Sequence, residues 1–157
     1  MTTRGEEIAA AARGCVGTPF RLHGRVPGRG LDCVGLVAHV GRSLGLIGHD
    51  ETGYGLSGSG ARLEAGLARA GLVRVNAEAG RDQAGQDQAG QVGDVLLFDL
   101  GRGLLHVAVR SEHGIIHAHR GLGRVVEHRL DEEWRAALAA VWRFPAGVPA
   151  MGERGHG

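Results

Sequence analysis

The sequence predicts a single α+β domain in which helices come first and an antiparallel sheet follows. Apolar residues repeat with a helical period in the first half of the chain, as far as Leu72. Short β-prone runs separated by turn residues occupy the second half, from Asp94 to Pro145. The chain has 157 residues, 43% of them hydrophobic and 22% charged, which suffices to bury one core. Helices and strands segregated in this way are typical of the α+β class.

Charge and hydropathy exclude several classes of protein. The formal net charge is +1, and the 18 basic residues, all arginine, form no basic stripe, so we expect no nucleic-acid surface. No apolar run approaches the roughly 20 residues that span a bilayer, and the N-terminal segment does not resemble a signal peptide. We therefore expect synthesis in the cytoplasm and no membrane span. The domain is expected over residues 1–146, followed by a flexible tail over residues 147–157.

Three helices are predicted in the first half of the chain. The first covers residues 3–16 and ends before Gly17 and Pro19. The second covers residues 32–46 and should lie centrally in the core, because one face is apolar throughout. That face is made of Leu36, Val37, Val40 and Leu44. The third covers residues 61–72.

The segments between these helices have no hydrophobic period. Glycine, proline and arginine alternate over residues 20–31, which predicts an irregular loop of a length that is often functional. Residues 48–60 are rich in glycine and polar side chains. The tandem "DQAGQDQAGQ" of residues 82–91 predicts a flexible surface connection without a chemical role.

Five β-prone runs follow and predict an antiparallel meander. These runs are "DVLLFDL" from Asp94, "LLHVAVR" from Leu104, "GIIHAHR" from Gly114, "GRVVEHRL" from Gly123 and "AAVWRFP" from Ala139. One short helix, "DEEWRAAL", interrupts them, with Asp131 as its N-cap.

The position of Cys33 suggests a nucleophile. Cys15 and Cys33 are too few for a disulfide framework or a zinc cluster. A single bridge between them is the alternative to the two free thiols that we expect. Cys33 lies at the start of the second helix, where unpaired N–H groups and the helix dipole lower the pKa of a thiol. A small residue packed at a helix start is the alternative for Cys33, and the preferred interpretation of Cys15. The choice depends on whether the fold brings a histidine to Cys33.

His106 is the candidate base. It lies in the apolar strand "LLHVAV", where alternation places it on the face opposite Leu105 and Val107. His117 follows eleven residues later on the next predicted strand, so a tight hairpin can bring the two side chains into contact. His119 shares the face of His117 and is its rival as the orienting group. His113 is expected in the solvated turn.

Together these segments resemble a known family. "GTPFRLHGRVPGRGLDCVGLV", followed by "GDVLLF", "HVAV" and "IIHAH", is similar to the NlpC-type family of papain-like cell-wall peptidases. The resemblance runs from about Gly14 to Pro145 and is greatest to the branch encoded with phage tails and gene-transfer particles. It implies a papain-like α+β fold, with the active site between the Cys33 helix and the strands that carry His106 and His117.

The resemblance also implies a role for each site residue. Cys33 would attack the peptide carbonyl, His106 would activate the thiol and protonate the leaving amine, and His117, the histidine of "IHA", would orient His106. Backbone N–H groups at the start of the Cys33 helix would form part of the oxyanion hole. Asp32 would bind the free amine of a peptide stem or serve only as the N-cap.

One position departs from the family pattern. Many relatives have a tyrosine after "GTP", with its hydroxyl near the nucleophile, whereas this chain has Phe20. Losing one such hydrogen bond would reduce turnover by about one to two orders of magnitude. His23, in the same loop, is a candidate replacement. We expect Phe20, His23 and Asp32 to lie on the substrate side of the site.

The resemblance therefore implies a cysteine endopeptidase that acts through a thioester and needs no cofactor. Its substrate would be the peptide stems of bacterial peptidoglycan, cleaved at the bond between D-glutamate and the diamino acid. Since the substrate lies outside the membrane, we expect delivery to the periplasm in a phage-like particle, with tail hub or tail-tip proteins as partners.

Three alternatives remain open. The chain could be a tail-tip structural module that keeps the fold but has weak or no activity. His113, His117 and His119 could be metal ligands, although no cysteine or carboxylate pair completes the set. A redox role is disfavoured because the cysteines lack C-x-x-C spacing. The peptidase hypothesis requires the Cys33 sulfur to be accessible and within side-chain reach of His106.

Overall fold

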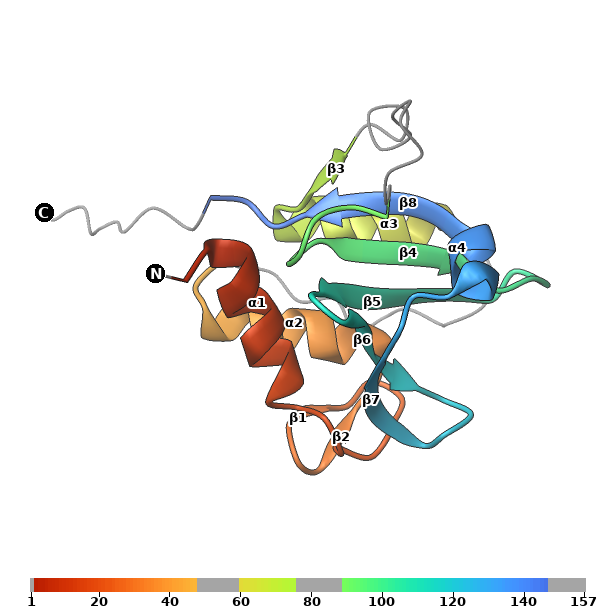
Figure 1. Cartoon of the computed structure of the whole chain (residues 1–157), viewed down its shortest axis with the longest axis horizontal. Helices are drawn as coiled ribbons and strands as arrows, with labels where there is room; N and C mark the ends of the chain where they lie inside the picture. Colours follow the sequence, from red (N-terminus) through yellow and green to blue (C-terminus); the bar gives the residue numbers. More distant parts are fainter. Residues whose placement is uncertain (1, 48–59, 76–88, 147–157) are drawn as a thin grey trace, which may run out of the picture.

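The structure is a computed structural model that describes residues 2–47, 60–75 and 89–146. The elements formed by these residues are, in chain order, α1 (Arg4–Arg13), β1 (Arg25–Val26), β2 (Gly30–Leu31), α2 (Cys33–Ser43), α3 (Gly60–Ala70), β3 (Val73–Val75), β4 (Val95–Asp99), β5 (Leu105–Ser111), β6 (Gly114–His119), β7 (Arg124–His128), α4 (Glu132–Ala137) and β8 (Leu138–Arg143) (Figure 1). None of the helices in the described ranges is long and apolar enough to cross a bilayer. The α+β expectation is confirmed.

The main sheet is antiparallel and has the strand order β3-β8-β4-β5-β6-β7. The predicted meander is correct for β4 to β7, which follow one another in space as in sequence. It is wrong for the last strand, because α4 carries the chain back across the sheet and β8 pairs with the other side of β4. The three-residue strand β3, too short to give a periodic signal, extends the sheet beyond β8.

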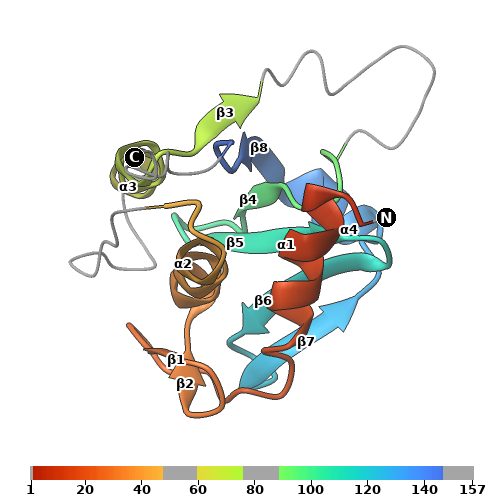
Figure 2. The same cartoon turned by 90° about the vertical axis from the view of Figure 1, so that its left-hand side faces the viewer.

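Strand alternation divides the interior into two layers. Val95 and Leu97 of β4 belong to the larger core cluster, which also contains the apolar faces of α1 and α2. Leu96 and Phe98 point to the other face, where α4 contributes Trp134. Figure 2 shows α1 and α2 crossing the same face of the sheet, with β1 and β2 next to the N-terminal end of α2. The start of α2 is thereby held between the sheet and the preceding loop.

The helices begin where predicted but end earlier. Thr3 caps α1 in a capping box with Glu6, and Asp32 caps α2. α1 ends at Arg13 rather than residue 16, and α2 at Ser43 rather than residue 46, and a turn follows each helix directly. α3 also ends two residues before its predicted end at residue 72.

The segment predicted as an irregular loop is in fact ordered by pairing. β1 and β2 form a two-stranded sheet within residues 20–31. The preceding residues add to the open edge of β7, since the N–H of Gly17 bonds to the oxygen of Val125 (2.9 Å) and that of Phe20 to the oxygen of Gly123 (2.8 Å). Pairing over so few residues leaves no period in the sequence. It joins the β7 edge to the start of α2.

Several sequence predictions fall outside the described residues. They are the polar segment before residue 60, most of the "DQAGQ" connection and the predicted tail over residues 147–157.

Candidate active site

A buried carboxylate organises the start of α2. Asp32 is fully buried, and its Oδ1 accepts the backbone N–H of Gly35 at 2.7 Å, which is an N-cap bond. Its Oδ2 accepts the backbone N–H of His23 at 2.8 Å, and the Arg25 guanidinium lies 3.3 Å from Oδ1. The N-cap role of Asp32 is therefore confirmed. The same carboxylate fixes the loop before β1 against the helix.

The loop and the helix approach each other too closely for a larger residue. A Cβ on Gly35 would collide with the carbonyl oxygen of Gly24. His23 accordingly adopts a left-handed backbone (φ 63°), and its side chain is exposed. This tight contact fixes the direction in which the chain enters α2 at Cys33.

The Cys33 thiol is sealed in the core. Cys33 has 0% exposure and belongs to the larger core cluster. Burial raises the pKa of the Cys33 thiol to about 12, and the Asp32 carboxylate contributes in the same direction. Backbone N–H groups of Val107, Val34 and Cys33 itself act in the opposite direction. The expectation that the helix terminus lowers this pKa is therefore wrong for this conformation, because desolvation is the larger effect.

His106 and His117 form a hydrogen-bonded pair. Nε2 of His106 lies 2.7 Å from Nδ1 of His117, across the neighbouring strands β5 and β6. The two rings meet edge to face, with centroids 4.8 Å apart. The predicted contact between these side chains is confirmed. His119, the rival, bonds elsewhere, since its Nδ1 accepts the backbone N–H of Leu122 at 3.1 Å.

Burial keeps both rings of the pair neutral. Desolvation lowers the pKa of His106 to about 4 and that of His117 to about 2. Neighbouring histidines lower both values further, His119 acting on His106, and His106 and His128 acting on His117. A neutral imidazole has a lone pair that can accept a proton. The lowered pKa also makes each ring a weaker base than an exposed histidine in this conformation.

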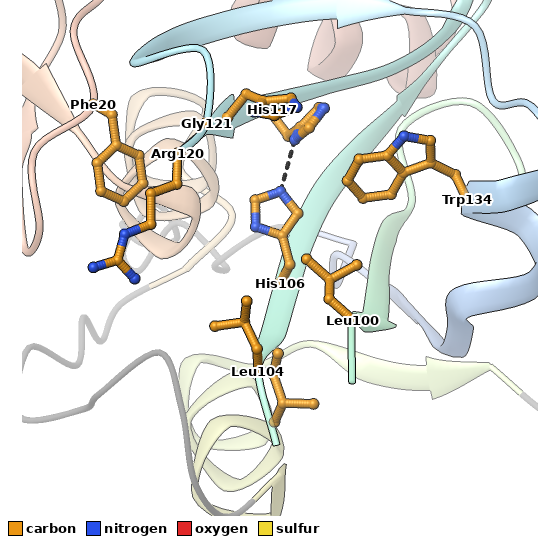
Figure 3. Close-up of a pocket in the computed structure, with 10 residues that line it drawn as sticks. Phe20, Leu100, Leu104, His106, His117, Arg120, Gly121 and Trp134 are labelled. Carbon is orange, nitrogen blue, oxygen red and sulfur yellow. Dashed lines mark hydrogen bonds between the residues drawn. The ribbon is translucent and has the colours of Figure 1, made fainter. Parts of the chain in front are cut away.

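The pair borders a pocket of about 330 Å³. In Figure 3, His106 and His117 face each other across the dashed bond, with Phe20 and Arg120 on one side and Trp134 on the other. The remaining lining residues are Leu100, Leu104, Leu105, His119 and Gly121. Phe20 therefore faces the histidine pair. Its place on the substrate side stays a prediction. Asp32 and His23 do not line this pocket.

The structure does not bring Cys33 into the same pocket. Its thiol lies against the backbone of Val107, the residue after His106 in β5. Because side chains alternate along a strand, Val107 points to the face that carries Cys33, whereas His106 points to the opposite face. Among the described residues, no hydrogen bond joins Cys33 to His106. The expectation of an accessible sulfur is not met in this conformation.

Comparison with known proteins shows to which family the chain belongs. Residues 17–143, most of its length, match the NlpC/P60 family. The chain belongs to the NlpC/P60 family. This region spans every element from the β1 loop to the end of β8 and so includes Cys33, His106 and His117. Among curated protein sequences there is no significant match.

Solved structures share the fold of this NlpC/P60 domain. The NlpC/P60 domain of the peptidoglycan hydrolase SagA is 24% identical, with a TM-score of 0.56 over 88% of this chain and 97% of that one. An NlpC/P60 family protein from Bacillus cereus is 19% identical (TM-score 0.56), over 92% of this chain and 41% of its own. NlpC1 from Trichomonas vaginalis is 18% identical (TM-score 0.58), over 92% and 45%. The chain thus spans less than half of the last two proteins.

Sequence reasoning missed three residues of the site in this NlpC/P60 domain. Trp134 of α4 contacts both rings of the pair, with centroids 5.9 Å from His106 and 5.0 Å from His117. Arg120 brings a positive charge to the pocket wall. Nε2 of His128 lies 2.8 Å from Nε2 of His117. A repeated interval was the available signal for His128, which follows His117 by eleven residues, as His117 follows His106.

The histidine cluster is not arranged as a metal site. Within the described part of the chain, no three His, Cys, Asp or Glu side chains are placed to hold a metal ion together.

Proposed function

We propose that this NlpC/P60 domain is a cysteine endopeptidase that hydrolyses peptide stems of bacterial peptidoglycan. The observation that carries the proposal is the neutral, hydrogen-bonded pair of His106 and His117 at the wall of a pocket, with the Cys33 thiol against the adjacent residue of the same strand. Family membership supports the reaction class, and the hydrolase SagA, a structural relative, supports the substrate class.

In the proposed reaction, His106 takes the proton of the Cys33 thiol and the thiolate attacks the amide carbonyl. The N–H groups of Cys33 and Val34, which act to lower the pKa of the Cys33 thiol, would stabilise the oxyanion that forms next to the sulfur. His106 then protonates the leaving amine, and water hydrolyses the thioester. His117 keeps His106 oriented. We propose that the bond cleaved joins D-glutamate to the diamino acid, without a cofactor.

The proposed reaction requires the sulfur to be uncovered. Phe20 and Leu105 line the pocket and also pack against the core cluster that contains Cys33. We place the opening at these two side chains, since their movement would connect the pocket to the core. Substrate binding by Phe20 needs no rearrangement. Binding of an amine by Asp32, or a polar contact from His23, would require the loop before β1 to move.

Digestion of purified peptidoglycan tests the proposal. Cys33→Ala and His106→Ala should abolish release of soluble peptides, because loss of the nucleophile or the base removes most of the acceleration. Cys15→Ala is the matched control and should retain activity. Mass analysis of the products identifies the bond. Equal product release by wild type and Cys33→Ala would contradict the proposal.

A second candidate function is an inert structural module with the peptidase fold. Two observations favour it: the Cys33 sulfur is sealed with its pKa raised to about 12, and Phe20 has no hydroxyl to offer the site. The same digestion separates the candidates, since an inert module would release no peptides. Phe20→Tyr should then restore nothing, whereas in a peptidase it should leave activity unchanged or raise it.

We further propose that the chain acts in the tail of a phage-like particle, assembled in the cytoplasm and delivered to the wall of the next cell, with tail hub or tail-tip proteins as partners. The motifs that resemble the phage-tail branch support this proposal. Mass spectrometry of purified particles should find the chain in the tail fraction. Its presence only as a free protein in lysate would contradict the proposal.

A further inference from the structure

A third histidine continues the pair toward the surface. His128 lies on β7, half-buried, and its Nε2 is 2.8 Å from Nε2 of His117. Its other nitrogen, Nδ1, lies 2.8 Å from the backbone oxygen of Arg129. His106, His117 and His128 thus form one chain of hydrogen bonds across β5, β6 and β7, which ends on a carbonyl group.

That carbonyl group fixes the direction of every bond in the chain. A carbonyl oxygen only accepts, so Nδ1 of His128 carries a proton, and in the neutral form of the ring Nε2 is then an acceptor. Nε2 of His117 must then donate to it, which leaves Nδ1 of His117 as the acceptor. Nε2 of His106 must in turn donate to His117, and the lone pair of His106 is left on Nδ1.

The direction matters because only one nitrogen of His106 can serve as the base. In Figure 3 the ring nitrogen of His106 that is not in the dashed bond points toward the side of the pocket occupied by Phe20 and Arg120. The hydrogen-bond chain places the lone pair on this nitrogen. The opposite direction would put a proton there and leave His106 unable to accept one.

The surroundings hold His128 in place. β6 and β7 approach so closely that a Cβ on Gly114 would collide with the carbonyl oxygen of His128, and the φ of Gly114 is +147°. Trp134 contacts the His128 ring from α4, with centroids 5.7 Å apart. The backbone of His128 is therefore held against β6, and its half-buried ring is held by Trp134.

We propose that His128 is a positioning residue that, through His117, sets the tautomer of His106 and so directs its basic nitrogen into the pocket. The consequence for catalysis rests on the proposed peptidase function. The hydrogen-bond chain itself does not, and can be measured in the free protein.

Nitrogen-15 NMR of the imidazole rings at pH 7 tests the proposal directly, because protonated and unprotonated ring nitrogens have well-separated chemical shifts. In the wild type we expect the proton on Nε2 of His106, Nε2 of His117 and Nδ1 of His128. His128→Phe keeps a ring but removes the acceptor, so the His117 and His106 signals should shift toward mixed tautomers. His128→Gln keeps an acceptor oxygen near the position of Nε2 and should preserve the wild-type pattern.

The effect of His128 on kcat and KM is measured with the same variants. His128→Phe should lower kcat about tenfold with little change in KM, the effect expected for one lost hydrogen bond that orients the base. His128→Gln should restore kcat. His113→Phe, a histidine-to-phenylalanine change in the exposed β5–β6 turn, is the matched control and should change neither spectra nor kcat.

A wild-type spectrum with the His106 proton on Nδ1 would overturn the proposal, and so would unchanged His117 signals in His128→Phe. If His128→Phe does not fold, the spectra of the wild type and of His128→Gln still test the expected positions of the ring protons. Expected spectra together with no peptidoglycan cleavage would refute the proposed function while leaving the positioning role of His128 intact.

Discussion

At the scale of single residues, the balance between two electrostatic effects determines the state of Cys33. A helix terminus stabilises a nearby charge by about 0.3–1 kcal/mol, which is less than one unit of pKa. Complete burial can raise the pKa of a thiol by several units. Desolvation therefore dominates at Cys33, which has 0% exposure. A nucleophilic thiolate at this position requires solvent, substrate or His106 to reach the sulfur.

The neutral histidine pair makes stability depend on pH. Below pH 6.5 the unfolded chain binds protons at His106 and His117, whereas the folded chain resists protonation down to about pH 4 and 2. The unfolded state then binds more protons, so stability falls as pH falls below 6.5. We expect a loss of about 2 kcal/mol per histidine at pH 5, measurable as a lower urea midpoint than at pH 7.5.

Replacement of one ring isolates this effect. His117→Phe should show a weaker dependence of the free energy of unfolding on pH, even if its stability at pH 7.5 is lower. His113→Phe alters an exposed histidine and should keep the wild-type dependence. An unchanged dependence in His117→Phe would show that burial of this histidine is not its source.

At the scale of elements, the start of α2 depends on a carboxylate that does more than cap. Asp32 accepts two backbone N–H groups and pairs with Arg25 while fully buried, whereas Asp131, the cap of α4, is exposed and accepts one, from Trp134. Asp32→Ala should cost more than about 2 kcal/mol of unfolding free energy, and Asp131→Ala about 1 kcal/mol. Urea unfolding at pH 7 measures both.

Equal losses in the two variants would show that the bonds from Asp32 to the loop add nothing to its capping role. The comparison matters for function because the same carboxylate fixes the entry of the chain into Cys33. A loop loosened by Asp32→Ala should also make the Cys33 thiol easier to alkylate than in the wild type.

The hairpins explain how the histidines come together. The β5–β6 hairpin turns at residues 112–113 and the β6–β7 hairpin at residues 120–123, and strand alternation then places the three histidines on one face of neighbouring strands. His106, His117 and His128 follow one another at intervals of eleven residues, and each consecutive pair is hydrogen-bonded. Strand alternation and hairpin length are local properties, so the first pair could be predicted from sequence. The third histidine follows from the same alternation of side chains, but across the longer turn between β6 and β7.

At the scale of the whole molecule, the sheet separates the two halves of the candidate site. α2 brings Cys33 to one face of β5, while α4 brings Trp134 over the histidines on the other. The pocket wall connects these layers at Phe20 and Leu105. If the protein is a peptidase, its activity depends on movement at this connection, whereas an inert module would keep it closed.

The sequence by itself determined the α+β class, the starts of the helices, the meander of β4 to β7 and the contact between His106 and His117. All of these follow from hydrophobic period, capping residues and hairpin length, which act over a few residues. Only the tertiary structure decided the place of β8, the pairing of residues 17–31, the burial of Cys33 and the role open to His128. These depend on which distant segments pack together, and desolvation in particular is set by neighbours that no local pattern specifies.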